Sequence, residues 1–241
     1  MFNNMVISSG HSLLVRGAAD LIDEVNEARR VTNRVIDYLK ELSCSVCVFH
    51  DDNSRTQRDN INTIVKHHNS QQRDLDVSVH FNAASKTDSP RGVEVLYVND
   101  NYRSLADKVS KAIADASGLI NRGAKKRTNL GFLNGTNKPA ILIEVCFVDS
   151  KADVQIYNSK FDEICLAIAE SLSGKKVEKG SVQEVKKFEV SDATKNAIKN
   201  LSQYGIVAEN FEVKDSNQAM LISIANNMVK AIKDGKLPVK Y

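Results

Sequence analysis

The chain has 241 residues, of which 42% are hydrophobic and 26% are charged. This balance is typical of a globular protein and excludes a disordered or fibrous chain. The formal net charge of +3 is too small for nucleic-acid binding by electrostatics alone. We find no apolar run near the roughly 20 residues of a membrane span and no secretory signal at the first residues. We therefore expect a protein synthesised in the cytoplasm, with neither nucleic acid nor membrane as its partner.

Strand-like and helix-like segments alternate along the first 172 residues. The predicted strands cover residues 6–8, 46–49, 76–80, 92–97 and 140–144, and the predicted helices cover residues 23–42, 56–68, 102–117 and 161–172. Such alternation predicts an α/β domain, here residues 1–174, with a twisted, mostly parallel sheet flanked by helices. In sheets of this kind, functional sites collect at the ends of the strands.

The composition changes after the last of these helices. Residues 175–188 are rich in Lys, Glu, Gly and Ser, which predicts a linker. Two helical patterns follow, one from about Ser191 to Gly205 and one over residues 215–233 with apolar side chains on one face. We therefore expect a second, small, mainly helical domain over residues 189–241.

Two histidines lie at the ends of predicted strands. His11 follows the first strand directly, and His80 ends the strand over residues 76–80. Two imidazoles and one carboxylate form a common catalytic zinc shell, which leaves one position for water. Glu24 and Glu27 lie one turn apart on the same face at the start of the first helix. Their spacing leaves both as candidates for the third zinc ligand.

Glu144 ends the strongly apolar strand over residues 140–144. A carboxylate is expensive to bury there unless it has a partner or a chemical purpose. A hydrolytic zinc site needs a base that takes a proton from water and returns it to the leaving group. Glu144 is therefore the candidate catalytic base, and a buried salt bridge is the alternative.

Five short motifs occur in order between Val6 and Leu172. They are Gly10-His11, Glu24, Ser78-Val-His80-Phe-Asn82, Gly92-Val-Glu-Val95 and Pro139-Ala-Ile-Leu-Ile-Glu144. Together they resemble the zinc-dependent N-acetylmuramoyl-L-alanine amidases, the amidase type 3 family. The resemblance implies that His11, Glu24 and His80 bind one zinc ion, that Glu24 is preferred to Glu27, and that Glu144 is the catalytic carboxylate.

This chain departs from the family pattern at two places. Ser12-Leu13 stands where the family often has Gly-Gly, and Phe49-His50 stands where it often has Thr-Arg. Neither departure removes a predicted ligand, but both are expected to reshape the substrate groove. We assign Asn82 and Arg58 as candidate substrate-binding residues.

The resemblance implies a hydrolase that uses zinc-activated water to cleave the amide bond between N-acetylmuramic acid and L-alanine in peptidoglycan. The C-terminal segment resembles, less closely, the small helical domains of phage lysins. We therefore expect a bacteriolytic endolysin that reaches the wall through a holin-made lesion or after lysis. Its C-terminal domain would bind the wall, including a secondary wall polymer, or form a homodimer. The alternatives are a sporulation or autolytic wall amidase, a zinc peptidase acting on stem peptides, and a wall-binding protein without catalysis.

Overall fold

The computed structural model describes residues 2–177, 192–203, 225–226 and 229. The chain divides into two compact units, residues 1–177 and residues 178–241. Within the described residues, no helix is both long and apolar enough to cross a membrane.

The first unit contains six strands and six of the described α-helices. The strands are β1 (Asn4–Ser12), β2 (Ser45–Asp51), β3 (Leu75–Asn82), β4 (Val93–Tyr97), β5 (Asn121–Lys126) and β6 (Ala140–Phe147). The helices are α1 (Glu24–Glu41), α2 (Gln57–Ser70), α3 (Arg103–Ser117), α4 (Gly131–Gly135), α5 (Lys151–Ser159) and α6 (Phe161–Ser173), and a 3-10 turn, η1 (Asp100–Tyr102), precedes α3.

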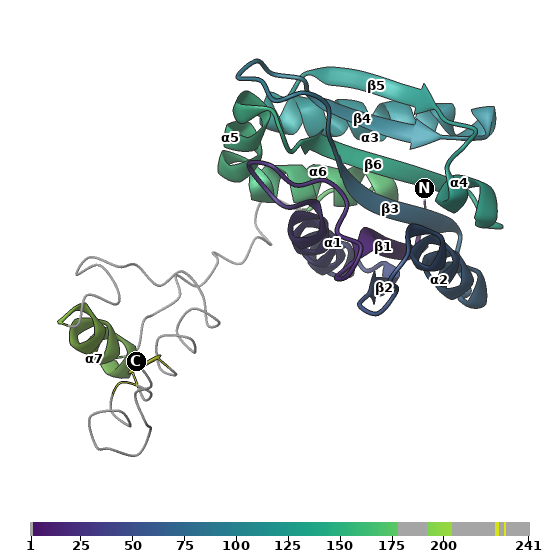
Figure 1. Cartoon of the computed structure of the whole chain (residues 1–241). Helices are drawn as coiled ribbons and strands as arrows, with labels where there is room; N and C mark the ends of the chain where they lie inside the picture. The colour runs from purple at the N-terminus through teal and green to yellow at the C-terminus, as the bar shows by residue number, and fades with distance from the viewer. Residues whose placement is uncertain (1, 178–191, 204–224, 227–228, 230–241) are drawn as a thin grey trace. The chain divides into compact units, whose positions relative to one another are not determined.

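The six strands form one sheet in the order β2-β1-β3-β6-β4-β5 (Figure 1). The strands β2, β1, β3 and β6 are parallel to one another, β4 runs antiparallel to β6, and β5 runs parallel to β4. The prediction of a mostly parallel sheet in an α/β domain is confirmed. The carboxyl ends of β1, β3 and β6 therefore lie on the same side of the sheet as the amino ends of β4 and β5. We call this side, which is formed by strand ends and not by an edge strand, the carboxyl edge.

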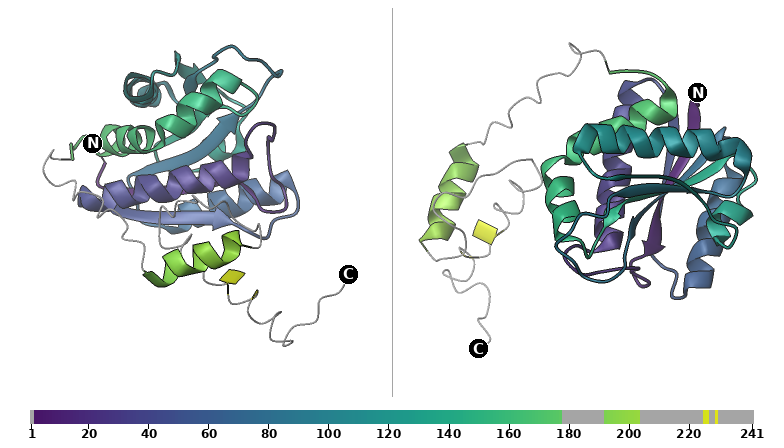
Figure 2. Two further views of the ribbon diagram at one scale, coloured as in Figure 1. Left: turned by 90° about the vertical axis from the view of Figure 1, so that its left-hand side faces the viewer. Right: turned by 90° about the horizontal axis from the view of Figure 1, so that it is seen from above.

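Helices cover both faces of the sheet (Figure 2). One face packs against α1, α3 and α6 and forms the larger apolar core, which includes Val77 and Val79 of β3. The opposite face packs against α2 and α4 in a smaller core around Leu142. Because successive side chains of a strand alternate between faces, Ser78 and His80 point to the same face as this smaller core.

Three elements were not predicted from the sequence. The strand β5 carries basic residues and a glycine without alternating apolar positions, which an edge strand tolerates because one side of it stays open to solvent. The helices α4 and α5 have only five and nine residues, too few for a helical period to stand out.

The second unit is described over α7 (Asp192–Ser202), which coincides with the first predicted C-terminal helix. Leu201 on α7 is fully buried, and the Asn200 side chain donates a hydrogen bond to Asn226 at 2.6 Å. Residues 178–188 of the predicted linker and most of the predicted helix over residues 215–233 lie outside the described residues. The division into a linker and a small helical domain therefore stays a prediction.

Candidate metal centre and active site

His11 lies near the end of β1, with a backbone φ of 63°. This is the left-handed region, which a residue with a Cβ seldom adopts and which is found more often at functional sites. The preceding residue, Gly10, lies directly against His80, because a Cβ at Gly10 would overlap the His80 ring. Only glycine therefore lets the backbone of β1 approach the imidazole on β3 this closely.

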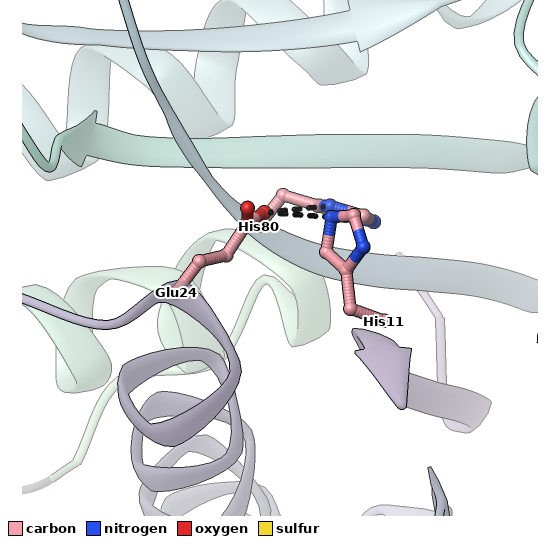
Figure 3. A group of neighbouring side chains, drawn as sticks. All are labelled: His11, Glu24 and His80. Carbon is pink, nitrogen blue, oxygen red and sulfur yellow. Dashed lines mark hydrogen bonds and ion pairs between the residues drawn. The ribbon is translucent and has the colours of Figure 1, made fainter. Parts of the chain in front are cut away.

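Glu24 is the first residue of α1, and its position follows from the helix cap. The Asp23 side chain accepts a hydrogen bond from the backbone N–H of Asn26, which fixes the start of the helix. Figure 3 shows the Glu24 carboxylate pointing toward both histidines. Its Oε1 lies 3.3 Å from Nε2 of His11 and 3.0 Å from Nδ1 of His80.

The Glu24 carboxylate is also held by the backbone. Its Oε1 accepts a hydrogen bond from the N–H of Phe81 at 3.1 Å, and its Oε2 accepts one from the N–H of Ala18 at 2.8 Å. Burial would raise the pKa of Glu24, but the hydrogen bonds to His11 and His80 outweigh it and hold the pKa well below its ordinary value. Glu24 is therefore an anion in a buried position.

His11, Glu24 and His80 fit a metal ion. One ligand atom from each lies within 4.8 Å of the other two, and the two imidazole rings stand 5.1 Å apart at 74°. Two ring nitrogens and one carboxylate oxygen are a donor set that zinc prefers when one coordination position stays open for chemistry. Across the described residues, this is the one group of three such side chains that could hold an ion.

Glu27, the other candidate ligand, lies apart from this group. Its Oε2 accepts a hydrogen bond from the Tyr157 hydroxyl of α5 at 2.5 Å and from Arg30 at 3.2 Å. Glu27 therefore joins α1 to α5 and takes no part in the His11–Glu24–His80 group.

Glu144 of β6 is next to His80 in the sheet, because the two are register partners on neighbouring strands. Its Oε2 atom is buried and has no hydrogen-bond partner. Burial, with the nearby charges of Glu24 and Glu94, raises the pKa of Glu144 to about 8, against the opposing effect of Arg127. A partly buried acid with an unpartnered oxygen and a raised pKa, beside a group that could hold a metal ion, is a candidate catalytic residue.

Glu94 of β4 continues a row of polar side chains across the sheet, formed by His80, Glu144 and Glu94 on neighbouring strands. We call this the polar row. Glu94 is the antiparallel partner of Glu144, and it accepts hydrogen bonds from Asn82 Nδ2 at 3.0 Å and Arg122 Nε at 2.7 Å. Neither Glu94 nor Arg122 was predicted from the sequence to belong to the site. The alternation of residues in β4 could have indicated Glu94, because Val93 and Val95 face the larger core and leave Glu94 on the opposite face.

The two candidate substrate-binding residues are placed differently. Asn82 ends β3 beside His80, and its amide is tied to Glu94. Arg58 lies exposed in the first turn of α2, and no hydrogen bond or ion pair joins it to the metal-binding group within the described residues. The structure therefore brings Asn82 to the polar row and leaves Arg58 outside it.

Ser12 and His50, one residue from each departure from the family pattern, lie at the carboxyl ends of β1 and β2. Ser12 donates a hydrogen bond to the Ser54 carbonyl at 2.6 Å and accepts one from the N–H of Val15 at 3.0 Å. His50 Nδ1 lies 2.8 Å from Ser9 Oγ, and its Nε2 lies 3.0 Å from Asn33 Oδ1. Both side chains therefore hold the segment around His11 in place.

These observations define an α/β protein with a His/Glu/His group that could hold a metal ion at the carboxyl edge of its parallel strands. Residues 5–173 match the family described as N-acetylmuramoyl-L-alanine amidase. The chain belongs to this family.

Curated relatives include proteins of Clostridium perfringens and of Staphylococcus species. A 38.4 kDa protein of Clostridium perfringens is 31% identical over 209 residues, which cover 85% of this chain and 60% of the relative. The probable cell wall amidase LytH of Staphylococcus aureus is 32% identical over 80 residues, which cover 33% of this chain and 27% of LytH. This chain spans about 60% of the length of its Clostridium perfringens relatives.

Solved structures share the fold of the first unit. The catalytic domain of the CD27L endolysin, which targets Clostridia difficile, is 24% identical with a TM-score of 0.66, covering 72% of this chain and 98% of that domain. The CwlD amidase of Clostridioides difficile, solved in complex with the GerS lipoprotein, is 20% identical with a TM-score of 0.62, covering 71% of this chain and 98% of CwlD.

Proposed function

We propose that this protein is a zinc-dependent peptidoglycan hydrolase that cleaves the amide bond between N-acetylmuramic acid and L-alanine. The observation that carries the proposal is the meeting of His11, Glu24 and His80 beside Glu144, whose Oε2 is buried without a partner. Membership of the amidase family supplies the identity of the bond.

His11, Glu24 and His80 would hold the zinc ion, with Glu24 as the anionic ligand. The ion supplies Lewis acidity, which activates water and polarises a carbonyl group. The protein supplies a rigid shell for it, since Phe81 and Ala18 fix the Glu24 carboxylate through their backbone N–H groups. Such outer contacts orient metal ligands and raise metal affinity.

Glu144 would move the proton. It takes a proton from the attacking water and then donates it to the departing L-alanine nitrogen. Burial holds the pKa of this carboxyl above its ordinary value in the metal-free protein, which favours its role as a proton acceptor, and the proton it takes is then available to the leaving nitrogen. Arg122 neutralises the adjacent Glu94, which limits the negative charge around Glu144.

The products of a small muramyl peptide test the proposed bond. N-acetylmuramoyl-L-alanyl-D-isoglutamine should yield N-acetylmuramic acid and a dipeptide with a free L-alanine amine, and a chelator should abolish the release. Cleavage within the peptide would instead support a zinc peptidase. Wall binding with no cleavage of any substrate would support a protein that binds walls without catalysis.

The biological role that we propose is that of a phage endolysin acting on Gram-positive walls of the clostridial kind. The likeness of the first unit to the CD27L catalytic domain and the Clostridium perfringens relatives support this choice. The enzyme would be made in the cytoplasm and reach the wall after holin-type release, and residues 178–241 would bind a wall polymer or a second copy.

Expression inside a Gram-positive cell separates this role from that of a sporulation or autolytic amidase. An endolysin should leave growing cells intact and lyse them within minutes once a pore-forming agent opens the membrane. Wall turnover during growth or sporulation, without membrane opening, would support the autolytic or sporulation role instead.

A further inference from the structure

Two arginines lie at the edge of the sheet that carries the metal-binding group. Arg91 lies two residues before the start of β4, and Arg122 is the second residue of β5. Because β4 and β5 run opposite to β6, their amino ends lie beside the carboxyl ends of β3 and β6 (Figure 1). Chain direction therefore places both arginines at the same edge as His80 and Glu144.

Both guanidinium groups lie on one aromatic ring. The guanidinium carbon of Arg91 is 5.3 Å from the centroid of the Phe147 ring, and that of Arg122 is 5.0 Å from it. Phe147 ends β6 and is the register partner of Asn82. The two guanidinium carbons are therefore at most about 10 Å apart, which a bound carboxylate can bridge.

The positive charges of Arg91 and Arg122 are only partly neutralised by carboxylates among the described residues. Glu94 neutralises Arg122 through Nε, and the Arg122 side chain is still 39% exposed. Arg91 donates hydrogen bonds to the Ser85 carbonyl and hydroxyl, and its Nε is buried without a partner. Among the described residues, no carboxylate lies within ion-pairing distance of the Arg91 side chain. Within the described residues, Arg122 has one carboxylate partner and the Arg91 guanidinium has none, so the two guanidinium groups can bind a further anion.

The spacing matches a short peptide. His80, Glu144, Glu94 and Arg122 lie on four successive strands of the sheet, so the backbones of His80 and Arg122 are about 14 Å apart at the usual strand separation. An extended peptide advances about 3.3 Å per residue, and an arginine side chain spans part of the remaining distance. A substrate with its scissile bond at the metal-binding group therefore reaches the arginines with the second or third residue of its peptide.

We propose that Arg91 and Arg122 form an anion subsite for a carboxylate of the stem peptide beyond L-alanine, so that the enzyme prefers acidic stems to amidated ones. The inference rests on the proposed function, because it places the scissile bond at the His11–Glu24–His80 group. In this arrangement the stem peptide runs from the metal-binding group toward β5. The subsite would orient the peptide by charge-assisted hydrogen bonds, which planar guanidinium groups form well with carboxylates.

Two substrates that differ in one functional group test the subsite. N-acetylmuramoyl-L-alanyl-γ-D-glutamyl-L-lysine carries a free α-carboxylate on its second residue, and N-acetylmuramoyl-L-alanyl-D-isoglutaminyl-L-lysine carries an amide there. In both substrates the γ-carboxyl of that residue is tied up in the peptide bond to lysine. The wild-type protein should cleave the acid with kcat/KM about tenfold higher or more, which is the usual effect of one charge-assisted hydrogen bond. Arg91→Gln should remove most of this preference and change kcat/KM for the amide by about twofold or less.

Two further variants complete the comparison. The double variant Glu94→Gln/Arg122→Gln removes both charges of the Glu94–Arg122 pair at once and should also reduce the preference, whereas Arg122→Gln alone would leave Glu94 buried and unpaired. Arg103→Gln is the matched control, because Arg103 lies on α3 over the opposite face of the sheet with 68% of its side chain exposed. It should keep the wild-type preference, and zinc content measured on each variant checks that the site is intact.

Equal cleavage of the acid and the amide by the wild-type protein would overturn the subsite and leave the proposed function standing. An equal loss on both substrates in Arg91→Gln would also overturn it. If neither substrate is cleaved, the proposed function fails, and calorimetry on Glu144→Gln then decides the subsite. If Glu144→Gln binds the acid more tightly than the amide, and the double variant Glu144→Gln/Arg91→Gln does not, the subsite is supported. Equal binding of both peptides by Glu144→Gln would contradict the subsite.

Discussion

Among single residues, Glu144 is the carboxyl group that the fold places most unfavourably. Its Oε2 is buried without a partner, and the negative charges of Glu24 and Glu94 lie near it. If it moves the proton in catalysis, Glu144→Gln should keep about one zinc per chain and lower kcat by about 10²- to 10⁴-fold, the range of general acid–base catalysis. Metal analysis and initial rates measure both quantities. Near-normal turnover at full zinc content would rule out Glu144 as the base.

The raised pKa of Glu144 also predicts how the stability of the metal-free protein depends on pH. Between the ordinary glutamate pKa of about 4.5 and the folded-state pKa of about 8, the folded state binds more protons than the unfolded state. Stability therefore falls as pH rises through this window. Glu144→Gln carries no charge, so its melting temperature should exceed that of the wild type by a margin that grows from pH 4.5 to pH 8 and then levels off.

Glu163→Gln provides a control of opposite sign. The backbone hydrogen bond of Glu163 and its contact with Lys160 lower the pKa of this exposed carboxyl, so its ionised form stabilises the fold. The difference in melting temperature between Glu163→Gln and the wild type should be small, become more negative as pH rises toward the ordinary glutamate pKa of about 4.5, and stay constant above it. A Glu144→Gln difference that is flat with pH would contradict the burial of an unpartnered acid.

Most of the candidate site could be predicted from the sequence, because the sequence shows where the apolar strands end. His11, His80 and Glu144 each end an apolar run, and parallel strands bring such ends to one edge. The choice between Glu24 and Glu27 depends on a contact with Tyr157, which is 130 residues away from Glu27. Arg91 and Arg122 were not predicted as site residues, because a single arginine in a polar segment adds nothing to the periodic pattern of apolar residues that indicates a strand or helix.

At the scale of elements, the loop between β1 and α1 holds the metal-binding group through Gly17. The φ of Gly17 is 69°, and a Cβ there would overlap Glu24 Oε2 and lie 2.6 Å from the His11 ring. Gly17→Ala should therefore weaken zinc binding by about 10- to 100-fold, as other changes to the surroundings of metal ligands do. A competition assay with a chromophoric chelator measures the affinity.

Gly118→Ala is the matched control for the backbone effect. Gly118 ends α3 with a φ of 85°, and a Cβ there would meet nothing within 4 Å. Both variants carry the strain of a side chain at positive φ, on the order of 1 kcal/mol. Only Gly17→Ala should lose zinc affinity. Equal zinc affinity in the two variants would show that the loop does not constrain the ligands.

Among the elements, those with long periodic segments were predicted and those without were not. The helix α1 buries a regular apolar face that includes Val31 and Val35, and β3 alternates between the two faces of the sheet. The strand β5 lies at the sheet edge and buries little of its basic sequence. The antiparallel direction of β4 was also invisible, because a strand's own residues do not specify the direction of its neighbour.

For the whole molecule, the two compact units predict separable activities. A chain ending at Val177, the limit of the first unit, should cleave a soluble muramyl peptide with kcat/KM within about twofold of the full chain. It should clear cell walls at least about tenfold more slowly, because tethering to the polymer raises the effective substrate concentration by such factors or more. Equal rates on walls for both chains would contradict a wall-binding role for residues 178–241.

We propose that a single zinc ion on His11, Glu24 and His80 enables the hydrolysis of the muramyl–alanine amide bond. Titration of zinc into the chelator-stripped full chain, with release of the free L-alanine amine as the readout, tests it most directly. The rate should rise linearly and level off at one zinc per chain, and His80→Ala should stay inactive at the same zinc level. Full activity in the stripped protein, or a rate that does not respond to zinc, would contradict the claim.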